Sequence, residues 1–350
     1  MKKWIKRIGI SIVVLIVAVI AVVYLMFQNE IATLMNMKKE HDYPAYTMTY
    51  VGDYGFDAFL EQGGASNDSE LIDFVVKRLL KGIPLEFSIP NLGCSTFIAV
   101  TPEGDVLFGR NFDLSYSPSL IVQTNPKNGY ASVSTVNLGF LGYNENKLPD
   151  SFLSRIISLA APYAPLDGMN EAGLSIGVLL IKDAPTNQTT EKDDITTTTA
   201  IRLILDQAAT VEEAVALLEQ YDMHSSANAA YHFQIADAYG NSVVIEYVDQ
   251  KMSIIYPEEE QPQAATNFLL TEGMQDVGGG HDRYEILIQT LTEKGSVLTE
   301  EEAMLLLQSV AQDKETSKTQ WSVVYNLTDQ TATYVIGMDY ENPIVIQLKK

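Results

Sequence analysis

The chain has 350 residues, of which 46% are hydrophobic and 19% charged, a composition typical of a globular protein with a sizeable core. Its formal net charge of −22 argues against a nucleic-acid partner, because phosphate binding needs a basic surface. We interpret the acidity as a solvated protein surface.

The N-terminus has the pattern of a membrane anchor. Four basic residues precede an uncharged run of 20 residues at 8–27; they are Lys2, Lys3, Lys6 and Arg7. A helix of that length crosses the ~30 Å hydrocarbon core at ~1.5 Å per residue. A cleaved signal peptide has a shorter apolar region followed by a small-x-small site, and YLMFQNEIA has no such site, so we expect an uncleaved anchor. The basic flank stays in the cytoplasm, which places residues 28–350, with 19 basic and 45 acidic side chains, outside.

Between the anchor and the lone cysteine, the pattern is mixed. Residues 28–62 form a connector and QGGASND, 62–68, a loop. Apolar spacing predicts a helix over 69–81, capped by Asp68 or Ser69, and its apolar stripe needs a partner surface. The two prolines of 83–93 predict an extended segment.

From Cys94 onward strands dominate. CSTFIAV and DVLFGRNF flank TPEG as a hairpin, and YHFQIADAYGNSVVIEYV reads as a second one. Further strands are expected at 121–123, 131–139, 174–181, 252–256, 321–326 and 332–337, and helices at 199–208, 211–220, 282–292 and 300–311. Two of these helices begin with a capping box, Thr210 with Glu213 and Thr299 with Glu302. The order of elements predicts α+β layers. The polar run 182–195 predicts a surface loop.

Standard metal and nucleotide motifs are absent. The sequence holds no HExxH, CxxC, P-loop or GxGxxG pattern. Its four histidines are scattered, at His41, His224, His232 and His281. We therefore expect neither a metal site nor a Ser/His/Asp triad.

Cys94 is the only cysteine, so it cannot form an intrachain disulfide. It is either an inert buried residue or a nucleophile. A turn at 102–104 places Cys94 opposite residues 111–113, so that Arg110 could lower the pKa of the thiol and Asp113 could bind a nearby amine. Strict alternation puts 110 and 113 on opposite faces, so bringing both to the thiol needs a bulge at Asn111 or Phe112 or a strand end. The alternative is an ordinary Arg/Asp surface pair.

GCSTF…GDVLFGRNFD resembles the start of the choloylglycine hydrolase and penicillin acyltransferase group, N-terminal nucleophile (Ntn) hydrolases that cleave linear amides. The family's cysteine, arginine and aspartate spacing fits Cys94, Arg110 and Asp113. Later segments resemble further family motifs in the same order; they are DGMNEAGLSIG with Asn170, AATNF with Asn267, GGHDRYEIL with Arg283, and TQWSVVYNLTDQTATY. The resemblance covers about residues 94–340.

The resemblance implies a four-layer αββα fold, no cofactor, and cleavage before the cysteine. Cys94 would attack the Gly93 carbonyl, and its freed α-amine, with a pKa of ~7.7–8, would then act as the base for its own thiol. Asp113 would hold the amine, Arg110 would support the thiolate, and Arg283 would balance charge. Asn267 and groups around Asn170 would bind the oxyanion.

The expected organisation is an anchor at 1–27, a pro-segment at 28–93 and a catalytic domain at 94–350. The long segment before Cys94 is more like the penicillin acyltransferase branch than the bile-salt branch. Substrates left open are N-acyl amino acids, bile-salt conjugates, penicillin V and acyl homoserine lactones, by hydrolysis or acyl transfer. The competing interpretations are a non-catalytic binding or sensor domain on this scaffold and a cysteine hydrolase without processing.

Overall fold

The computed structural model describes residues 2–85, 93–258, 261–314 and 316–348. Its helices are α1 (Lys2–Asn36), α2 (Phe56–Glu61), α3 (Asp68–Arg78), η1 (Leu138–Leu141), η2 (Ile156–Tyr163), α4 (Thr197–Gln207), α5 (Val211–Leu218), η3 (Ser226–Asn228), α6 (His281–Lys294) and α7 (Glu300–Ser309). The first ten strands are β1 (Lys38–His41), β2 (Ala45–Thr49), β3 (Gly93–Val100), β4 (Val106–Leu114), β5 (Ser119–Thr124), β6 (Ser132–Asn137), β7 (Asp167–Asn170), β8 (Leu174–Ile181), β9 (Asp193–Thr196) and β10 (Tyr221–His224). The others are β11 (Ala230–Asp237), β12 (Ser242–Val248), β13 (Lys251–Ile255), β14 (Ala264–Ala265), β15 (Asn267–Phe268), β16 (Gly278–Gly279), β17 (Asp313–Lys314), β18 (Ser317–Asn326), β19 (Thr331–Ile336) and β20 (Ile344–Gln347).

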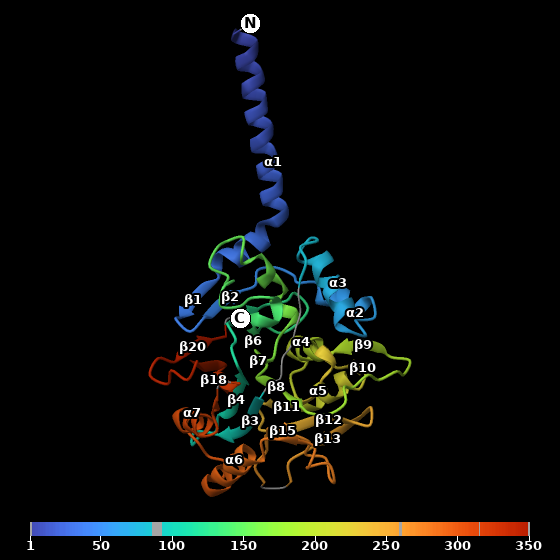
Figure 1. Ribbon diagram of the computed structural model, residues 1–350, viewed down its shortest axis with the longest axis vertical. Helices are drawn as coiled ribbons and strands as arrows, with labels where there is room; N and C mark the ends of the chain where they lie inside the picture. Colours follow the sequence, from blue (N-terminus) through green and yellow to red (C-terminus); the bar gives the residue numbers. More distant parts are fainter. Residues whose placement is uncertain (1, 86–92, 259–260, 315, 349–350) are drawn as a thin grey trace.

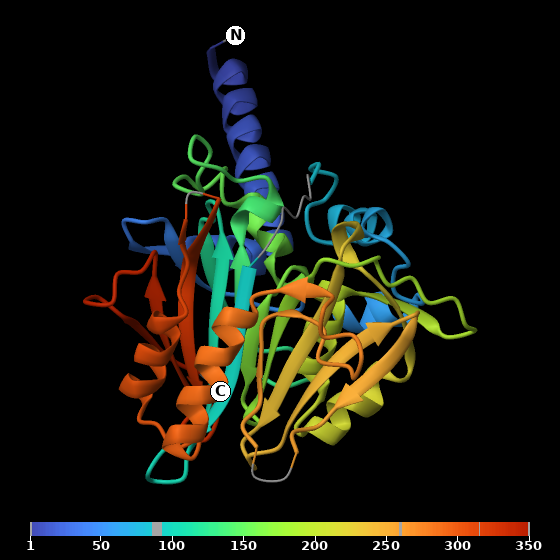
Figure 2. The ribbon, with the colours of Figure 1, turned by 60° about the horizontal axis from the view of Figure 1, so that its bottom comes forward.

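Two large sheets form the centre of the molecule (Figures 1 and 2). The nine-stranded sheet has the order β1-β2-β5-β6-β7-β8-β11-β12-β13. The seven-stranded sheet has the order β14-β3-β4-β18-β19-β20, with β17 paired to β18. Both expected hairpins are present, as β3–β4 and β11–β12.

Helices cover the outer face of each sheet, which gives the expected four-layer αββα fold. Leu107 of β4 packs in a cluster with Leu291 of α6 and Leu306 of α7, whereas its neighbour Phe108 belongs to the main core between the sheets. This alternation is the period-two pattern of a strand that is buried on both faces. The opposite outer face, on the nine-stranded sheet, lies against α4 and α5 (Figure 1).

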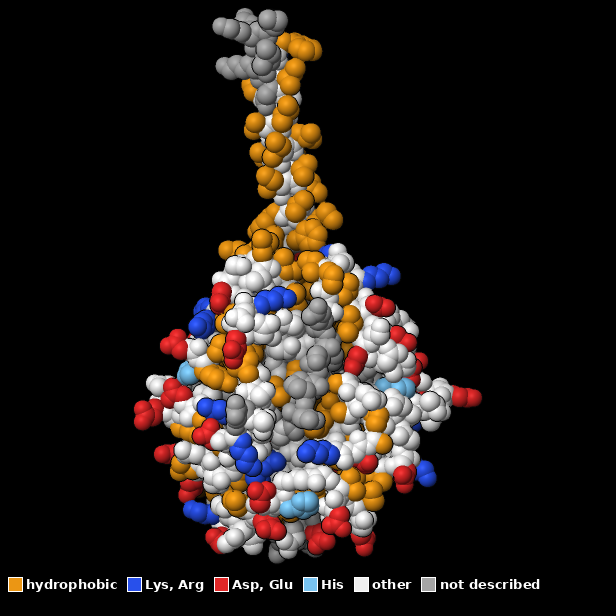
Figure 3. All heavy atoms as spheres, viewed as in Figure 1, with side chains coloured by type: hydrophobic (Ala, Val, Ile, Leu, Met, Phe, Trp, Pro, Cys, Tyr) orange, Lys and Arg blue, Asp and Glu red, His pale blue; other side chains and the backbone are white. Residues whose placement is uncertain are grey.

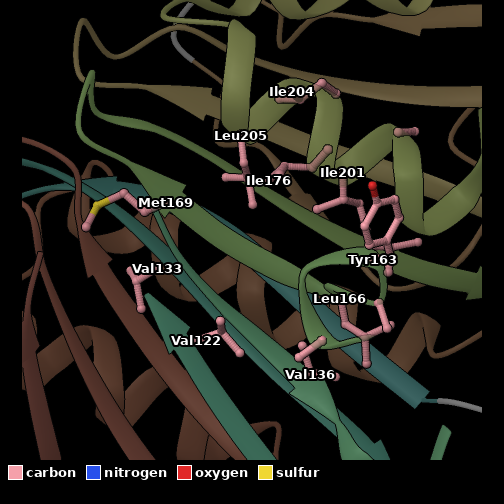
Figure 4. Packing of buried hydrophobic residues seen from close by; sticks show 14 of the residues in the cluster. Val122, Val133, Val136, Tyr163, Leu166, Met169, Ile176, Ile201, Ile204 and Leu205 are labelled. Atoms are coloured by element: carbon pink, nitrogen blue, oxygen red, sulfur yellow. The ribbon is translucent and has the colours of Figure 1, made fainter. Parts of the chain in front are cut away.

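Helix α4 packs on the nine-stranded sheet and is buried on nearly all sides, from Thr197 to Asp206. Figure 4 shows Ile201 and Leu205 of α4 next to Ile176 of β8. All three side chains are fully buried, and each such burial contributes about 1.5–3 kcal/mol before the entropy cost.

The N-terminal helix runs further than its apolar segment. α1 continues to Asn36, with non-helical backbone at Phe27, and projects from the body of the protein (Figure 1). The part from Ile10 onward is long and apolar enough to cross a membrane, a test that a signal sequence also passes. Its last turns are docked, because Leu34 is buried and the Thr33 hydroxyl accepts a hydrogen bond from the Val51 amide at 2.8 Å.

Residues 28–62, which we expected to form a connector, instead contain the end of α1, strands β1 and β2 and helix α2. Strand β2 pairs in parallel with β5, from Ala45 opposite Ser119 to Thr49 opposite Gln123. Strand β2 gives little sequence signal because it is short and its pairing with β5 is long-range. The expected helix at 69–81 is α3, but its N-cap is Asn67, whose side chain accepts from the Glu70 amide. Most of the expected extended segment 83–93 lies outside the described residues.

Downstream elements match the expectations closely. The strands at 174–181 and 242–248 have the expected bounds, and the four helices α4 to α7 differ from theirs by a few residues. Thr299 and Glu302 form the expected capping box. At Thr210 only half of the box is present, because the Glu213 carboxylate accepts from the Ala209 amide instead. The expected loop at 182–195 ends in the unforeseen strand β9, which pairs with β10.

Candidate active site

The thiol of Cys94 lies in the core between the two sheets. Cys94 is the second residue of β3, pairs with Phe112 of β4 and is fully buried. Arg110, two residues before Phe112, projects from the same face of the sheet, and its Nη2 atom lies 3.5 Å from the Cys94 sulfur. The expected register, which brings GRNFD opposite Cys94, is confirmed.

The hairpin has no bulge at Asn111 or Phe112 of the kind that would bring both Arg110 and Asp113 to the thiol. Pairing of β3 with β4 is regular from Gly93–Asp113 to Val100–Val106. Asp113 therefore lies on the face opposite to Arg110 and approaches the backbone at Gly93 instead of the thiol. The irregularity occurs on the other side of β4, in β18 between Thr319 and Trp321.

Burial raises the pKa of the Cys94 thiol in the uncut chain. The Arg110 guanidinium acts in the expected direction and lowers the pKa, Asp113 raises it, and Arg283 lowers it. Burial outweighs the two cations because a thiolate without water contact is poorly solvated.

Asp167 holds Arg110 in place, and sequence reasoning missed it. The Arg110 Nε atom donates to Asp167 Oδ2 at 2.8 Å, and both side chains are fully buried. Trp321 Nε1 donates to the same oxygen at 3.1 Å, and the Tyr325 hydroxyl donates to Oδ1 at 2.6 Å. The only sequence feature that pointed to Asp167 was its place at the start of DGMNEAG.

Two side chains hold the backbone of Cys94. Its amide donates to Asn267 Oδ1 at 2.8 Å, and the same oxygen accepts from Arg283 Nη2 at 2.7 Å. Arg283 Nη1 donates to the Cys94 carbonyl and to the Ser95 hydroxyl. Asn267 Nδ2 in turn donates to the carbonyl of Leu180 at 2.9 Å. Cys94 thus contacts three of the other five residues expected in the site; they are Arg110, Asn267 and Arg283.

Asp113 lies beside Gly93, next to the junction that the resemblance singles out. Its carboxylate accepts from Gln312 and from the Thr319 hydroxyl, and Oδ2 lies 3.5 Å from Arg283 Nη1. A Cβ added at Gly93 would come within 2.6 Å of the Gln312 amide nitrogen and 3.0 Å of Asp113 Oδ2. Close approach of these side chains explains why glycine precedes the cysteine.

The structure does not bring Asn170 to the thiol. Asn170 ends β7, and its Nδ2 atom donates to the carbonyls of Leu205 and Ala208. Its Oδ1 atom accepts from the amides of Ala172 and Leu174. These four contacts tie the Asn170 side chain to the β7–β8 turn and to the C-terminal end of α4, and none of them reaches the thiol.

A buried His232–Glu246 pair supports the Asn267 segment, and sequence reasoning missed it too. His232 of β11 lies within 3.0 Å of Glu246 of β12 through Nδ1, and its Nε2 lies 2.7 Å from the Thr266 carbonyl. Glu246 also accepts from the amides of Leu270 and Thr271. The pair thereby fastens both ends of the segment that carries Asn267.

The other three histidines have partners of their own. His41 pairs with Asp339, His224 pairs with Asp194, and His281 stacks on Phe268. Within the part of the chain that the structure describes, no group of three His, Cys, Asp or Glu side chains could hold a metal ion.

A cavity of about 400 Å³ opens beside Gly93. It is lined by Gly93, Leu180, Lys182, Asn267, Gly279, Gly280, Arg283, Gln312, Lys314, Thr316 and Ser317. The cavity reaches the residue before Cys94 while the thiol itself stays buried.

Comparison with known proteins identifies the family. The model of the linear amide C–N hydrolases, choloylglycine hydrolase family, matches residues 94–268, half of the chain. The chain belongs to this family. The match begins at Cys94 and includes Arg110, Asp113 and Asn267, whereas Arg283 lies beyond it.

Individual relatives of this choloylglycine hydrolase family member are distant. A penicillin V acylase from Pectobacterium atrosepticum is 31% identical over 106 residues, which span 27% of this chain and only 28% of that relative's length. A mutant conjugated bile acid hydrolase from Clostridium perfringens is 17% identical, with a TM-score of 0.52 over 73% of this chain and 92% of that one. The structural similarity shows the Ntn hydrolase fold.

Proposed function

We propose that this protein hydrolyses a linear amide with Cys94 as an N-terminal nucleophile, exposed by cleavage of the Gly93–Cys94 bond. The observation that carries the proposal is that three atoms of Cys94 each have a separate partner. Arg110 contacts the sulfur, Asn267 accepts from the nitrogen, and Arg283 donates to the carbonyl oxygen. Any buried residue needs partners for its backbone amide and carbonyl, but a cysteine used only as a small apolar side chain needs no buried arginine beside its sulfur.

Cleavage begins with attack of the Cys94 sulfur on the Gly93 carbonyl carbon. The peptide C–N bond breaks as a thioester forms, and the nitrogen takes up the thiol proton. Water then hydrolyses the thioester, which leaves a carboxylate on Gly93 and a free α-amine on Cys94.

The amine supports the next reaction at the same sulfur. Cleavage creates an α-ammonium group beside the thiol, and this positive charge lowers the thiol pKa from its raised value in the uncut chain. The thiolate attacks the substrate carbonyl, the substrate amine leaves with a proton, and water hydrolyses the acyl-enzyme. Arg110 stabilises the thiolate, and Asp113, near Gly93, is placed to attract the ammonium group.

Asn267 takes a different role from the one the resemblance implies. Its Nδ2 atom already donates to Leu180, and its Oδ1 atom accepts from Cys94. We assign it to orienting the Cys94 nitrogen, and Arg283 to holding Asn267 and the Cys94 carbonyl.

The test is an amide panel with one chemical control. Purified protein is incubated with N-acyl amino acids, bile-salt conjugates, penicillin V and acyl homoserine lactones, and the released amine is measured. Cys94 is the single cysteine and therefore the only thiol that iodoacetamide can alkylate. Activity should fall in proportion to the fraction of chains that carry one alkyl group. Processed protein that releases no amine from any of them favours a binding domain on this scaffold.

We expect the segment before Gly93 to stay with the catalytic domain after cleavage. Strand β2 is hydrogen-bonded to β5 inside the nine-stranded sheet, and the Tyr54 hydroxyl donates to buried Asp206 at 2.7 Å. Leu71 and Val75 of α3 are buried as well. Affinity purification through a tag on the N-terminal fragment should recover both fragments without denaturant. Recovery of the N-terminal fragment alone contradicts retention and leaves the amidase proposal intact.

Retention of the N-terminal segment would also determine where the catalytic domain is located. With α1 as a single membrane span and the basic residues inside, the retained segment would hold an extracytoplasmic catalytic domain at the membrane. Membranes washed at neutral pH should contain both fragments, and recovery of the amidase only in the soluble fraction would contradict this placement.

Glu246 should act on the reaction through the position of Asn267. Replacing Glu246 with leucine removes the acceptor for His232 and for two amides of the 266–271 segment, so we expect kcat to fall about 10–100-fold with a smaller change in KM. The matched variant Glu246→Gln keeps a carbonyl acceptor of the same shape and should recover most of kcat. Equal loss in both variants, or a change confined to thermal stability, would show that the pair is only structural.

A further inference from the structure

Two adjacent apolar side chains, Phe152 and Leu153, are exposed at the surface, with 44% and 75% of their area accessible. They lie in the sequence PDSFLSR, 149–155, in the loop between η1 and η2. Single exposed apolar side chains are ordinary on a protein surface, whereas neighbouring ones that form a patch indicate contact with a partner. The place of this turn in the molecule limits what that partner can be.

Hydrogen bonds on both sides hold the turn in one conformation. The Ser151 amide donates to the Ser154 hydroxyl at 2.9 Å, and the Ser154 amide donates to the Ser151 hydroxyl at 3.2 Å. The Ser154 hydroxyl donates in turn to the Ser151 carbonyl, and the Tyr143 hydroxyl donates to the Ser154 carbonyl at 2.6 Å. The backbone that flanks Phe152 and Leu153 is thus ordered while their side chains remain exposed.

The turn is joined to the end of α1. Arg155 Nη1 donates to the Leu34 carbonyl of α1 at 3.1 Å, and its Nε atom donates to the Pro149 carbonyl at 3.0 Å. The Tyr46 hydroxyl of β2 donates to Asp150 at 2.9 Å. Figures 1 and 2 both show this green loop beside the end of α1 that enters the body. The position of α1 therefore determines the position of the turn.

The joint on α1 lies close to the end of the apolar segment. Leu34 follows Phe27, the last residue of the uncharged run, by seven residues, or about 10 Å along a helix. The headgroup layer beside the hydrocarbon core is itself about 5–8 Å thick, so Arg155 fixes the base of the turn near that layer. Met35, the residue after Leu34, is 71% exposed. Figure 3 shows hydrophobic side chains gathered where α1 meets the body.

We propose that Phe152 and Leu153 enter the interfacial layer of the bilayer that α1 spans and form a second membrane contact. This contact rests on the proposed membrane placement of α1 and does not depend on the amidase activity. Transfer of apolar side chains from water to the boundary of the acyl chains is favourable. A single helix leaves the body free to turn about its own axis, whereas a second contact gives the body, and with it the cavity beside Gly93, one orientation to the membrane.

The experiment places one fluorescent probe on the full-length chain in phosphatidylcholine nanodiscs, which leave both membrane faces open to water. Cys94→Ala removes the native thiol, and Leu153→Cys provides a single site for an environment-sensitive nitrobenzoxadiazole label. Val19→Cys, in the apolar run, reports whether α1 spans the bilayer. Ile286→Cys is the matched control, because it is an exposed apolar residue of α6, at the end of the body opposite α1 (Figure 1).

Each label is tested with two quenchers. One is a phosphatidylcholine with a nitroxide near the carbonyl end of one acyl chain, and the other is iodide in the water. We expect the label at 153 to be quenched by the lipid nitroxide and to be shielded from iodide several-fold relative to the label at 286. The label at 19 should be shielded from iodide, and the label at 286 should be quenched by iodide alone.

The failures are distinguishable. Access of iodide to the label at 19 overturns the membrane placement of α1, on which the contact rests. A shielded label at 19 with a label at 153 that behaves like the one at 286 leaves α1 in the membrane and overturns the contact. Shielding from iodide at 153 without quenching by the lipid nitroxide means that protein covers the turn, and this result also overturns the proposal.

Discussion

Replacing Cys94 with alanine is expected to yield a folded, uncut and inactive chain. The substitution removes the sulfur that attacks Gly93 and the substrate carbonyl, so both reactions stop together. Amine release should fall to the uncatalysed rate, and the intact mass should be that of a single chain. Because the thiol is small and buried, the variant should unfold cooperatively within about 5 °C of an uncut reference.

The control for this variant is an uncut chain with its thiol intact. Gly93→Val keeps Cys94 but brings a Cβ against Gln312 and Asp113, so we expect slowed cleavage with the thiol still present. Measurable cleavage or amide hydrolysis by Cys94→Ala would contradict a cysteine nucleophile.

Replacing Arg110 with methionine is expected to cost both stability and activity. The change leaves the Asp167 carboxylate buried without its cation, which should destabilise the fold by about 3–5 kcal/mol. It also removes the cation next to the thiolate, so amide hydrolysis should fall about 100-fold or more. Urea denaturation and steady-state kinetics measure the two effects separately.

The double variant Arg110→Met/Asp167→Asn separates the two roles of Arg110. It removes both charges and keeps acceptor and donor atoms for Trp321 and Tyr325. We expect it to regain most of the stability and none of the activity. Recovery of activity together with stability would mean that Arg110 serves the fold alone.

Local sequence rules were sufficient for the hairpin that carries the thiol. A tight turn at TPEG fixes the register, so Cys94 opposite Phe112 follows from counting. The same counting across the AYGN turn places His232 opposite or next to Glu246. The sequence could therefore have predicted this pair, although the scatter of the four histidines drew attention away from it.

Long-range contacts explain what the sequence could not provide. Which sheet face meets Arg110 depends on β7 and β8, so Asp167 could not be distinguished from other acidic residues. Asn170 lies in a segment that resembles a family motif, yet its side-chain amide bonds within the turn and to the end of α4. Strand β2 joins the sheet through a parallel pairing with β5 that no local pattern predicts.

The intact mass of wild-type protein extracted from membranes tests the central claim most directly. The account predicts two fragments, with the larger one beginning at Cys94 and carrying the amidase activity. A full-length chain that hydrolyses amides with the Gly93–Cys94 bond unbroken would contradict it.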